Sequence, residues 1–305
     1  MTVGHTTARS PQAMPAKPCL GPRPASARPV RKLPAGAVDT HFHVFGPLDR
    51  FPYAEDRKYT PPEAPYGRYI ELADRVGIDR AVCVHPNTHG PDNSVTLDAL
   101  AQSSGRLLGI VKIDEGVAFA DLVRMDRLGV RGIRFAFNPE HGGELDAGLF
   151  RRACDWAGEL GWCIDLHMAA ADLPALAEDL SKLSVPILID HMARIDPAAG
   201  TTQLPLKVLL QLMQMPHVWV KLSGADRITR AGPPYEDVVP LARALVRAAP
   251  DRVVWGSDWP HSGYFDPARV PDDAALVDLS FAFAPDEVQH RKLMVDNPSR
   301  LFRMQ

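Results

Sequence analysis

The chain has 305 residues, of which 46% are hydrophobic and 23% charged, a composition typical of a globular protein that buries a large core in one sizeable domain. Its formal net charge is -3 and its pI is about 6.4, so no overall basic field favours binding to nucleic acid or to anionic lipid. No apolar run approaches the roughly 20 residues that a membrane-spanning helix needs.

The N-terminal segment differs in composition from the rest. Residues 1–36 are rich in Pro, Ala, Arg and Ser, and the first acidic residue of the chain is Asp39. Such a segment has too few large apolar residues to form a packed core. We therefore expect a poorly ordered arm over 1–36, followed by one barrel domain over 37–305.

The cysteines give information about the compartment. No two of them have C-x-x-C spacing, and two lie inside apolar runs. The four are Cys19, Cys83, Cys154 and Cys163. This pattern favours reduced thiols over disulfides or a metal cluster, and hence a cytoplasmic location.

From Ala37 onward, short apolar runs alternate with amphipathic segments. The runs predict strands at Ala37–His43, Ala81–His85, Leu107–Ile113, Val130–Phe137, Cys163–Met168, Val185–His191, Val218–Leu222 and Val253–Asp258. The segments between them predict helices at Ala64–Val76, Ser94–Ala101, Ala120–Leu128, Ala147–Leu160, Leu173–Leu183, Leu204–Met213 and Val238–Ala248. This alternation and length predict an α/β fold, a (β/α)₈ TIM barrel. A doubly wound open sheet is the alternative, but no glycine-rich phosphate-binding motif follows any strand.

Titratable side chains stand at the ends of several predicted strands. His41 and His43 share one side of the first strand, His167 and His191 end the fifth and sixth, and Asp258 ends the eighth. In a barrel these ends meet on one face, where α/β enzymes build their sites. Imidazole and carboxylate groups are ligands for a divalent ion such as zinc, which would generate hydroxide near neutral pH. For Asp258 taken alone, a helix-capping role is the alternative.

Four segments carry a resemblance to a known family. They are Asp39–His43, the histidine after the Pro-Ile-Leu-Ile-Asp run, Trp255–His261 and Asp296–Phe302. Together they resemble the amidohydrolase superfamily, and within it the lactonase branch that includes the 2-pyrone-4,6-dicarboxylate hydrolases. The similarity extends from about Pro34 to Phe302 and implies an amidohydrolase-like (β/α)₈ barrel.

The resemblance also implies roles for individual residues. Asp258 would be the base that activates water against a lactone carbonyl, and His41, His43 and His191 would line the carbonyl and the water. Substrate carboxylates would be held by arginines, for which Arg134, Arg227 and Arg194 are the candidates, because a planar guanidinium binds a carboxylate through two hydrogen bonds. Alternatively, Arg134 forms a buried ion pair and Arg227 is an exposed loop charge. Tyr59, Asn87 and His89 are further candidates for substrate contacts, and His261 is a candidate to orient Asp258.

Two departures from the family pattern affect these expectations. Glu140 stands where a pyrone hydrolase has a further substrate-binding arginine, and an acid there would repel a second carboxylate. His167 stands where the metal-free enzyme has a tyrosine, which makes His41, His43, His167 and Asp258 available as ligands for one divalent metal ion, with zinc favoured. A metal-free mechanism is the alternative.

The sequence thus predicts a hydrolase that opens the ring of a small carboxylated lactone. Lactones like 2-pyrone-4,6-dicarboxylate, muconolactones and sugar-acid lactones are the candidate substrates, and no nucleic acid or membrane partner is expected. Two other functions remain open: a metal-dependent decarboxylase of an aromatic or unsaturated acid, and a non-catalytic binding barrel.

Overall fold

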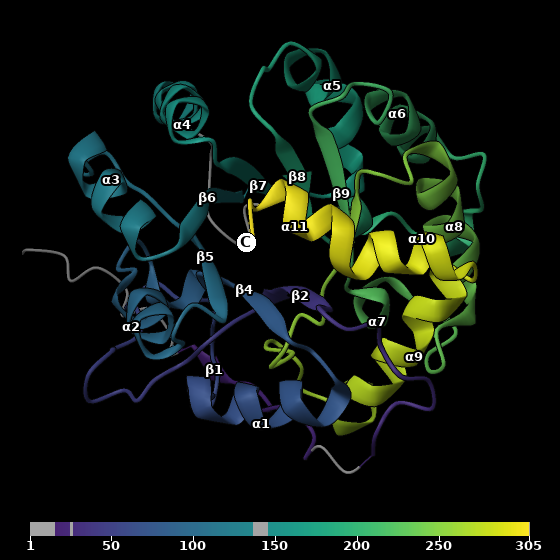
Figure 1. Cartoon of the computed structure of the whole chain (residues 1–305), viewed down its shortest axis with the longest axis horizontal. Coiled ribbons are helices and arrows are strands. Elements are labelled where there is room, and N and C mark those ends of the chain that lie inside the picture. Colours follow the sequence, from purple (N-terminus) through teal and green to yellow (C-terminus); the bar gives the residue numbers. More distant parts are fainter. Residues whose placement is uncertain (1–15, 25–26, 137–145, 305) are drawn as a thin grey trace, which may run out of the picture.

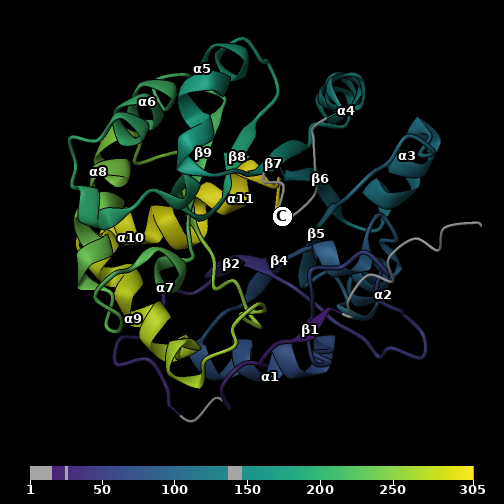
Figure 2. The ribbon, with the colours of Figure 1, turned by 180° about the vertical axis from the view of Figure 1, so that it is seen from behind.

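A computed structural model of the chain describes residues 16–24, 27–136 and 146–304. Eight parallel strands form one sheet that curves into a barrel, with the helices outside it (Figures 1 and 2). The strands are Val38–Phe42 (β2), Arg80–Val84 (β4), Leu107–Val111 (β5), Val130–Ala136 (β6), Cys163–His167 (β7), Ile187–Ile189 (β8), Val218–Leu222 (β9) and Val253–Trp255 (β10). Each strand pairs with the next in sequence, which confirms the predicted (β/α)₈ barrel.

The barrel closes between its first and last strands. The Asp258 amide donates to the His41 carbonyl oxygen at 2.8 Å, and Phe42 and Trp259 form a parallel bridge. Gly256 permits this close approach, because a Cβ at that position would lie 2.6 Å from the His41 Cβ. Closure therefore brings the predicted base next to the predicted histidine pair.

All seven predicted helices are present, with small changes at the ends of most of them. The α-helices are Tyr66–Val76 (α1), Ser94–Gln102 (α2), Phe119–Arg127 (α3), Ala147–Leu160 (α4), Leu173–Ser181 (α5), Leu204–Leu212 (α6), Ala225–Ile228 (α7), Val239–Ala248 (α8), Asp273–Phe283 (α9), Glu287–Arg291 (α10) and Asn297–Leu301 (α11). The short α7 was not predicted, nor were the last three helices, which follow the eighth strand. None of the helices in the described ranges is long and apolar enough to cross a membrane.

Several strands are shorter than predicted, and the two that lose the most residues, β8 and β10, both end at the site. β8 stops at Ile189 because residues 191–194 adopt positive φ values of 50–54°, which extended structure does not allow. β10 stops at Trp255, and Asp258 has a φ of 62°. Each strand thus gives way to a left-handed turn that carries a predicted site residue, the kind of conformation that clusters at functional sites.

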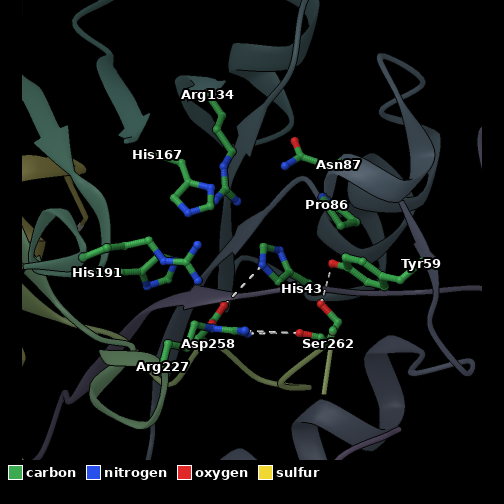
Figure 3. A pocket seen from close by; sticks show the side chains of 12 residues that line it. His43, Tyr59, Pro86, Asn87, Arg134, His167, His191, Arg227, Asp258 and Ser262 are labelled. Atoms are coloured by element: carbon green, nitrogen blue, oxygen red, sulfur yellow. Dashed lines mark hydrogen bonds and ion pairs between the residues drawn. The ribbon is translucent and has the colours of Figure 1, made fainter. Parts of the chain in front are cut away.

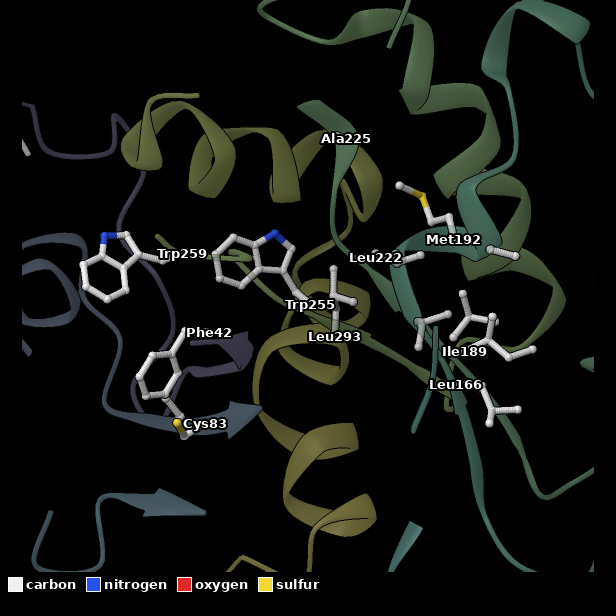
Figure 4. Close-up of a cluster of buried hydrophobic side chains, with 14 of the residues drawn as sticks. Phe42, Cys83, Leu166, Ile189, Met192, Leu222, Ala225, Trp255, Trp259 and Leu293 are labelled. Atoms are coloured by element: carbon white, nitrogen blue, oxygen red, sulfur yellow. The ribbon is translucent and has the colours of Figure 1, made fainter. Parts of the chain in front are cut away.

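Apolar side chains fill both the outside and the inside of the sheet. Phe42, Leu166, Ile189 and Trp255 belong to the large cluster between strands and helices (Figure 4). Inside the barrel a second cluster includes the side chains of Val82, Ile110, Leu188, Val254 and Phe302. Phe302 directly follows α11, the helix that contacts β2 and β10. One end of the barrel is thus packed with apolar groups, and the carboxyl ends of the strands are left for chemistry.

Part of the segment expected to be an arm is described, and there it contacts the barrel domain. Lys17–Pro18 (β1) pairs with Tyr59–Thr60 (β3), and the Leu20 amide donates to the Tyr264 carbonyl oxygen at 2.7 Å. Residues 1–15 and 25–26 lie outside the described residues, as does Glu140.

Candidate active site

A cavity of about 220 Å³ opens at the carboxyl ends of the strands (Figure 3). It is lined by His43, Tyr59, Pro86, Asn87, Arg134, His167, His191, Arg194, Arg227, Asp258, Ser262 and Gly263. Three guanidinium groups and one carboxylate face this small space. The cavity is therefore suited to a compact anionic molecule placed beside an acid that can accept a proton.

His41, His43 and Asp258 meet at the floor of the cavity. The Nε2 atoms of the two histidines are 3.3 Å apart, and Asp258 Oδ1 lies 3.4 Å from His43 Nε2 and 3.6 Å from His41 Nε2. The expectation that the H-x-H pair shares one side of its strand is confirmed. The two rings differ in exposure, however: His43 lines the cavity, whereas His41 is fully buried behind it and does not line it.

Arg227 holds the other oxygen of the base. Its Nε donates to Asp258 Oδ2, and its terminal nitrogens both lie 3.3 Å from the Ser262 carbonyl oxygen. Burial by itself would raise the pKa of Asp258, but the Arg227 charge and the nearby histidines outweigh it and hold that pKa well below its usual range. Asp258 is therefore ionised throughout the neutral range, as a general base must be. The alternative of an exposed loop charge at Arg227 is wrong, because its guanidinium is tied to the base.

Asp39 fixes the position of both strand ends beneath the base. Its Oδ1 accepts from the amides of His41 and Ser257, and its Oδ2 accepts from the hydroxyls of Tyr69 and Ser257. Burial raises the pKa of Asp39 to about 6, although these four hydrogen bonds oppose that rise. Asp39 thus ties the end of β2 to the turn that leads to Asp258.

A buried ionic cluster lies behind the cavity. Lys221 on β9 contacts Asp165 Oδ2 at 2.8 Å, Asp190 Oδ1 at 2.7 Å and His41 Nδ1 at 2.9 Å. Arg134 reaches the same acids, at 3.1 Å from Asp190 Oδ2 and 3.7 Å from Asp165 Oδ1. Arg134 therefore forms the buried ion pair that the sequence left open as an alternative, and it also lines the cavity.

His191 stands on the left-handed turn after β8. Its Nδ1 is 2.8 Å from Ser223 Oγ, and burial lowers its pKa to about 4, so the ring is neutral at pH 7. Gly224 lies against this ring, because a Cβ at Gly224 would be 3.1 Å from His191 Nδ1. The His167 ring packs edge-on to His191, with centroids 5.4 Å apart.

The other predicted contacts divide into two groups. Tyr59, Asn87 and Arg194 line the cavity, and the Tyr59 hydroxyl is 2.8 Å from Ser262 Oγ. His89 does not line it: its Nδ1 lies 3.1 Å from the Pro52 carbonyl oxygen. The His261 ring lies 2.9 Å from Asp273 Oδ1, so the expectation that this ring orients Asp258 is wrong.

Two groups of side chains in the described residues have the spacing of metal ligands. One is His41, His191 and Asp258, and the other is His41, Asp165 and Asp190. The second group already surrounds a cation, the Lys221 ammonium. The predicted set of His41, His43, His167 and Asp258 does not coincide with either group, since His191 takes part and His167 does not.

Sequence reasoning missed Lys221, Ser223 and Ser262. A signal for Lys221 was present, because a lysine interrupts the apolar run of Val218–Leu222 and buried lysines need partners. Nothing in the local sequence pointed to Ser223 or Ser262.

Comparison with known proteins places this geometry in a family. A family model described as "Amidohydrolase" matches residues 38–304. The 4-sulfomuconolactone hydrolase of Hydrogenophaga intermedia is 57% identical over 96% of this chain and 97% of its own length. The 2-pyrone-4,6-dicarboxylate hydrolase of Comamonas testosteroni is 38% identical over 90% of this chain and 93% of its own. A crystal structure described as a putative 2-pyrone-4,6-dicarboxylic acid hydrolase from Pseudomonas putida superposes with a TM-score of 0.75, at 32% identity over 90% of this chain and 99% of that one.

Proposed function

We propose that this chain, which belongs to the amidohydrolase family, opens the ring of a small anionic lactone. The attacking water is activated by Asp258. The observation that carries the proposal is the placement of Asp258. One carboxylate oxygen is held by Arg227 while the other, Oδ1, lies by His43 at the floor of the cavity.

In the first step Asp258 takes a proton from a water molecule as the water oxygen bonds to the ring carbonyl carbon. The carbonyl oxygen gains negative charge and is stabilised by the cavity-lining N–H groups of Arg134 and Arg227, an effect commonly of several kcal/mol. The bond from this carbon to the ring oxygen then breaks, and the proton on Asp258 passes to the departing ring oxygen. The product is an open-chain acid, and Asp258 is ready for another cycle.

The three arginines determine which lactones fit. Arg134, Arg194 and Arg227 come from β6, from the turn after β8 and from α7, so they surround the cavity. A guanidinium binds carboxylate and sulfonate oxygens alike, since both present two acceptors in one plane. We therefore place the substrate among unsaturated muconolactones that carry a carboxylate and a second anion, with a sulfonate as that second group. Identity of 57% and 55% to two 4-sulfomuconolactone hydrolases supports this choice over a pyrone dicarboxylate.

The decarboxylase alternative is not favoured, because relatives that are 57%, 55% and 38% identical to this chain are named as hydrolases of lactones. The four cysteines have free thiols in the structure, which supports a reducing compartment such as the cytoplasm.

A substrate panel tests the proposal. Purified protein is assayed with 4-sulfomuconolactone, an unsubstituted muconolactone, 2-pyrone-4,6-dicarboxylate and a sugar lactone, with ring opening and carbon dioxide measured separately. We expect ring opening without carbon dioxide, with the highest kcat/KM for the sulfonated lactone. Release of carbon dioxide, or no ring opening of any lactone, would contradict the proposal.

A further inference from the structure

Lys221 is a fully buried lysine that makes no contact with the cavity, yet it touches one of the two histidines of the H-x-H pair. We propose that Lys221 is a positioning residue that fixes the His41 ring proton on Nε2. His41 then acts as an N–H donor toward the base and is not available as a metal ligand. The meaning of this arrangement for catalysis rests on the proposed function, but the proton position itself does not.

The groups around the Lys221 ammonium determine which ring nitrogen of His41 carries the proton. An ammonium has three N–H donors and no acceptor. Lys221 Nζ donates to Asp165 Oδ2 at 2.8 Å, forms an ion pair with Asp190 Oδ1 at 2.7 Å and lies 2.9 Å from His41 Nδ1. Two carboxylates keep the lysine charged, so His41 Nδ1 must present its lone pair to it. A neutral His41 then carries its proton on Nε2.

The neighbouring histidine has the opposite proton position for an equally simple reason. His43 Nδ1 lies 2.7 Å from the Val84 carbonyl oxygen, which can only accept, so Nδ1 carries the proton. His43 Nε2 is then an acceptor, 3.3 Å from His41 Nε2. The N–H of His41 thus faces two acceptors, His43 Nε2 and Asp258 Oδ1, and no two donors or two lone pairs oppose each other along this path.

The Lys221 charge also polarises the hydrogen bonds along this path. A buried cation donates to His41, and His41 in turn donates toward the oxygen of Asp258 that faces the cavity. Hydrogen bonds in such a chain polarise one another in a low-dielectric interior. Lys221 therefore holds His43 and Asp258 in one arrangement without touching the substrate, which is how outer hydrogen-bond partners orient catalytic groups.

The position of the His41 proton also decides whether His41 can bind a metal ion. An imidazole binds a metal through a lone pair, and His41 has none at Nε2 while Lys221 occupies Nδ1. Asp190 Oδ1 lies 3.4 Å from His41 Nδ1 but is already paired with Lys221, so moving the proton to Nδ1 would set an N–H against a buried ammonium and remove a charge-assisted hydrogen bond. The residues present therefore do not fit an ion that is shared by both histidines of the H-x-H pair.

Histidine tautomers can be measured directly in the full-length wild-type protein. In ¹⁵N-histidine-labelled protein, two-bond ¹H–¹⁵N correlations distinguish the Nδ1–H from the Nε2–H form, and a His41→Gln variant identifies the His41 signals by their loss. We expect the Nε2–H form at His41 and the Nδ1–H form at His43, both unchanged after one equivalent of Zn²⁺. An Nδ1–H form at His41, or loss of its Nε2 proton when Zn²⁺ is added, would overturn the proposal. No substrate is needed, so the result does not depend on lactonase activity.

A variant tests the consequence for turnover. Lys221→Met removes the donors at similar length, and Asp165→Asn is the matched control because it alters the cluster but keeps the Lys221 contact with His41. We expect kcat of Lys221→Met to fall by about 10- to 100-fold with KM within about 3-fold, and the His41 signals to lose the Nε2–H pattern. Asp165→Asn should keep that pattern.

If Lys221→Met does not fold, the double variant Lys221→Met/Asp165→Asn removes one positive and one negative group together, and the same measurements apply. A Lys221 variant that keeps both the wild-type kcat and the His41 Nε2–H form would contradict the proposal.

Discussion

Arg227 and Asp258 form a buried ion pair in which the guanidinium Nε donates to one carboxylate oxygen and leaves the other by His43. The pair keeps the base ionised and in place. The same positive charge also makes Asp258 a weaker base, because it lowers the pKa of the carboxyl group. A substrate anion that binds Arg227 would offset this charge, so the pKa of Asp258 would rise when the substrate is bound.

Replacing Arg227 should therefore change the pH dependence of turnover. Because the Arg227 charge lowers the pKa of Asp258, its removal in Arg227→Met raises that pKa, and the acid limb of kcat moves to higher pH. KM for an anionic lactone should also rise by about 10- to 100-fold, since a hydrogen bond to a charged group is lost. Rate profiles from about pH 3 to 8 measure both effects.

Arg230→Met is the control, because exposed Arg230 pairs with Asp196 outside the cavity. An acid limb at the same pH in wild type and Arg227→Met would show that Arg227 does not set the pKa of the base.

Alanine substitutions at two glycines distinguish the effect of backbone strain from the effect of displacing the His191 ring. Gly224 and Gly232 have φ values of 67° and 79°, so alanine at either site costs about 1 to 2 kcal/mol of strain. Only at Gly224 would the new Cβ meet the His191 ring, whereas it would meet nothing within 4 Å at Gly232. We expect both variants to unfold at lower urea concentrations, and only Gly224→Ala to lose about 100-fold in kcat. Equal kcat values for the two variants would show that the position of the His191 ring does not affect turnover.

The sequence predicted the parts of the site that depend on local pattern. Period-two alternation placed His41 and His43 on one side of their strand, and strand ends located His191 and Asp258. Lys221 was not predicted as a site residue because its partners come from β2, β7 and the turn after β8, and only the barrel brings them together. The pairing of Arg227 with the base had the same cause, since its position on α7 is set by packing.

A histidine far from the cavity should make stability depend on pH. The His290 ring stacks on Phe281 with centroids 3.8 Å apart, and burial, with the nearby Arg31 charge, lowers its pKa to about 4. An unfolded histidine titrates near 6.5, so below that pH the unfolded chain binds a proton that the folded one does not. Stability present above about pH 6.5 is therefore lost as the pH falls toward 4.

Between pH 7 and pH 5 this loss should be about 1 kcal/mol after solvent screening, and His290→Gln should be spared it. Urea unfolding at the two pH values measures the difference, with Gln289→Ala as a non-titrating neighbour. The same loss in His290→Gln as in wild type would assign the pH dependence to other groups.

Chelation tests the consequence of the Lys221 cluster for activity. Because His41 offers no lone pair at Nε2, we expect protein dialysed against dipicolinic acid to retain kcat within about 2-fold, with metal well below one equivalent by elemental analysis. A control sample dialysed without chelator fixes the reference rate. Activity that disappears on chelation and returns with Zn²⁺ would show that a metal takes part in the reaction.

The central claim is that Asp258 moves the proton of the attacking water, and Asp258→Asn tests it most directly. Asparagine keeps the size of the side chain and one oxygen acceptor but cannot take up the proton. The measurement is single-turnover ring opening of the sulfonated lactone together with its Kd, and Asp266→Asn, an exposed capping position, is the control. We predict a rate lower by about 10³-fold or more with Kd within about 3-fold. A rate within about 10-fold of wild type would contradict the account.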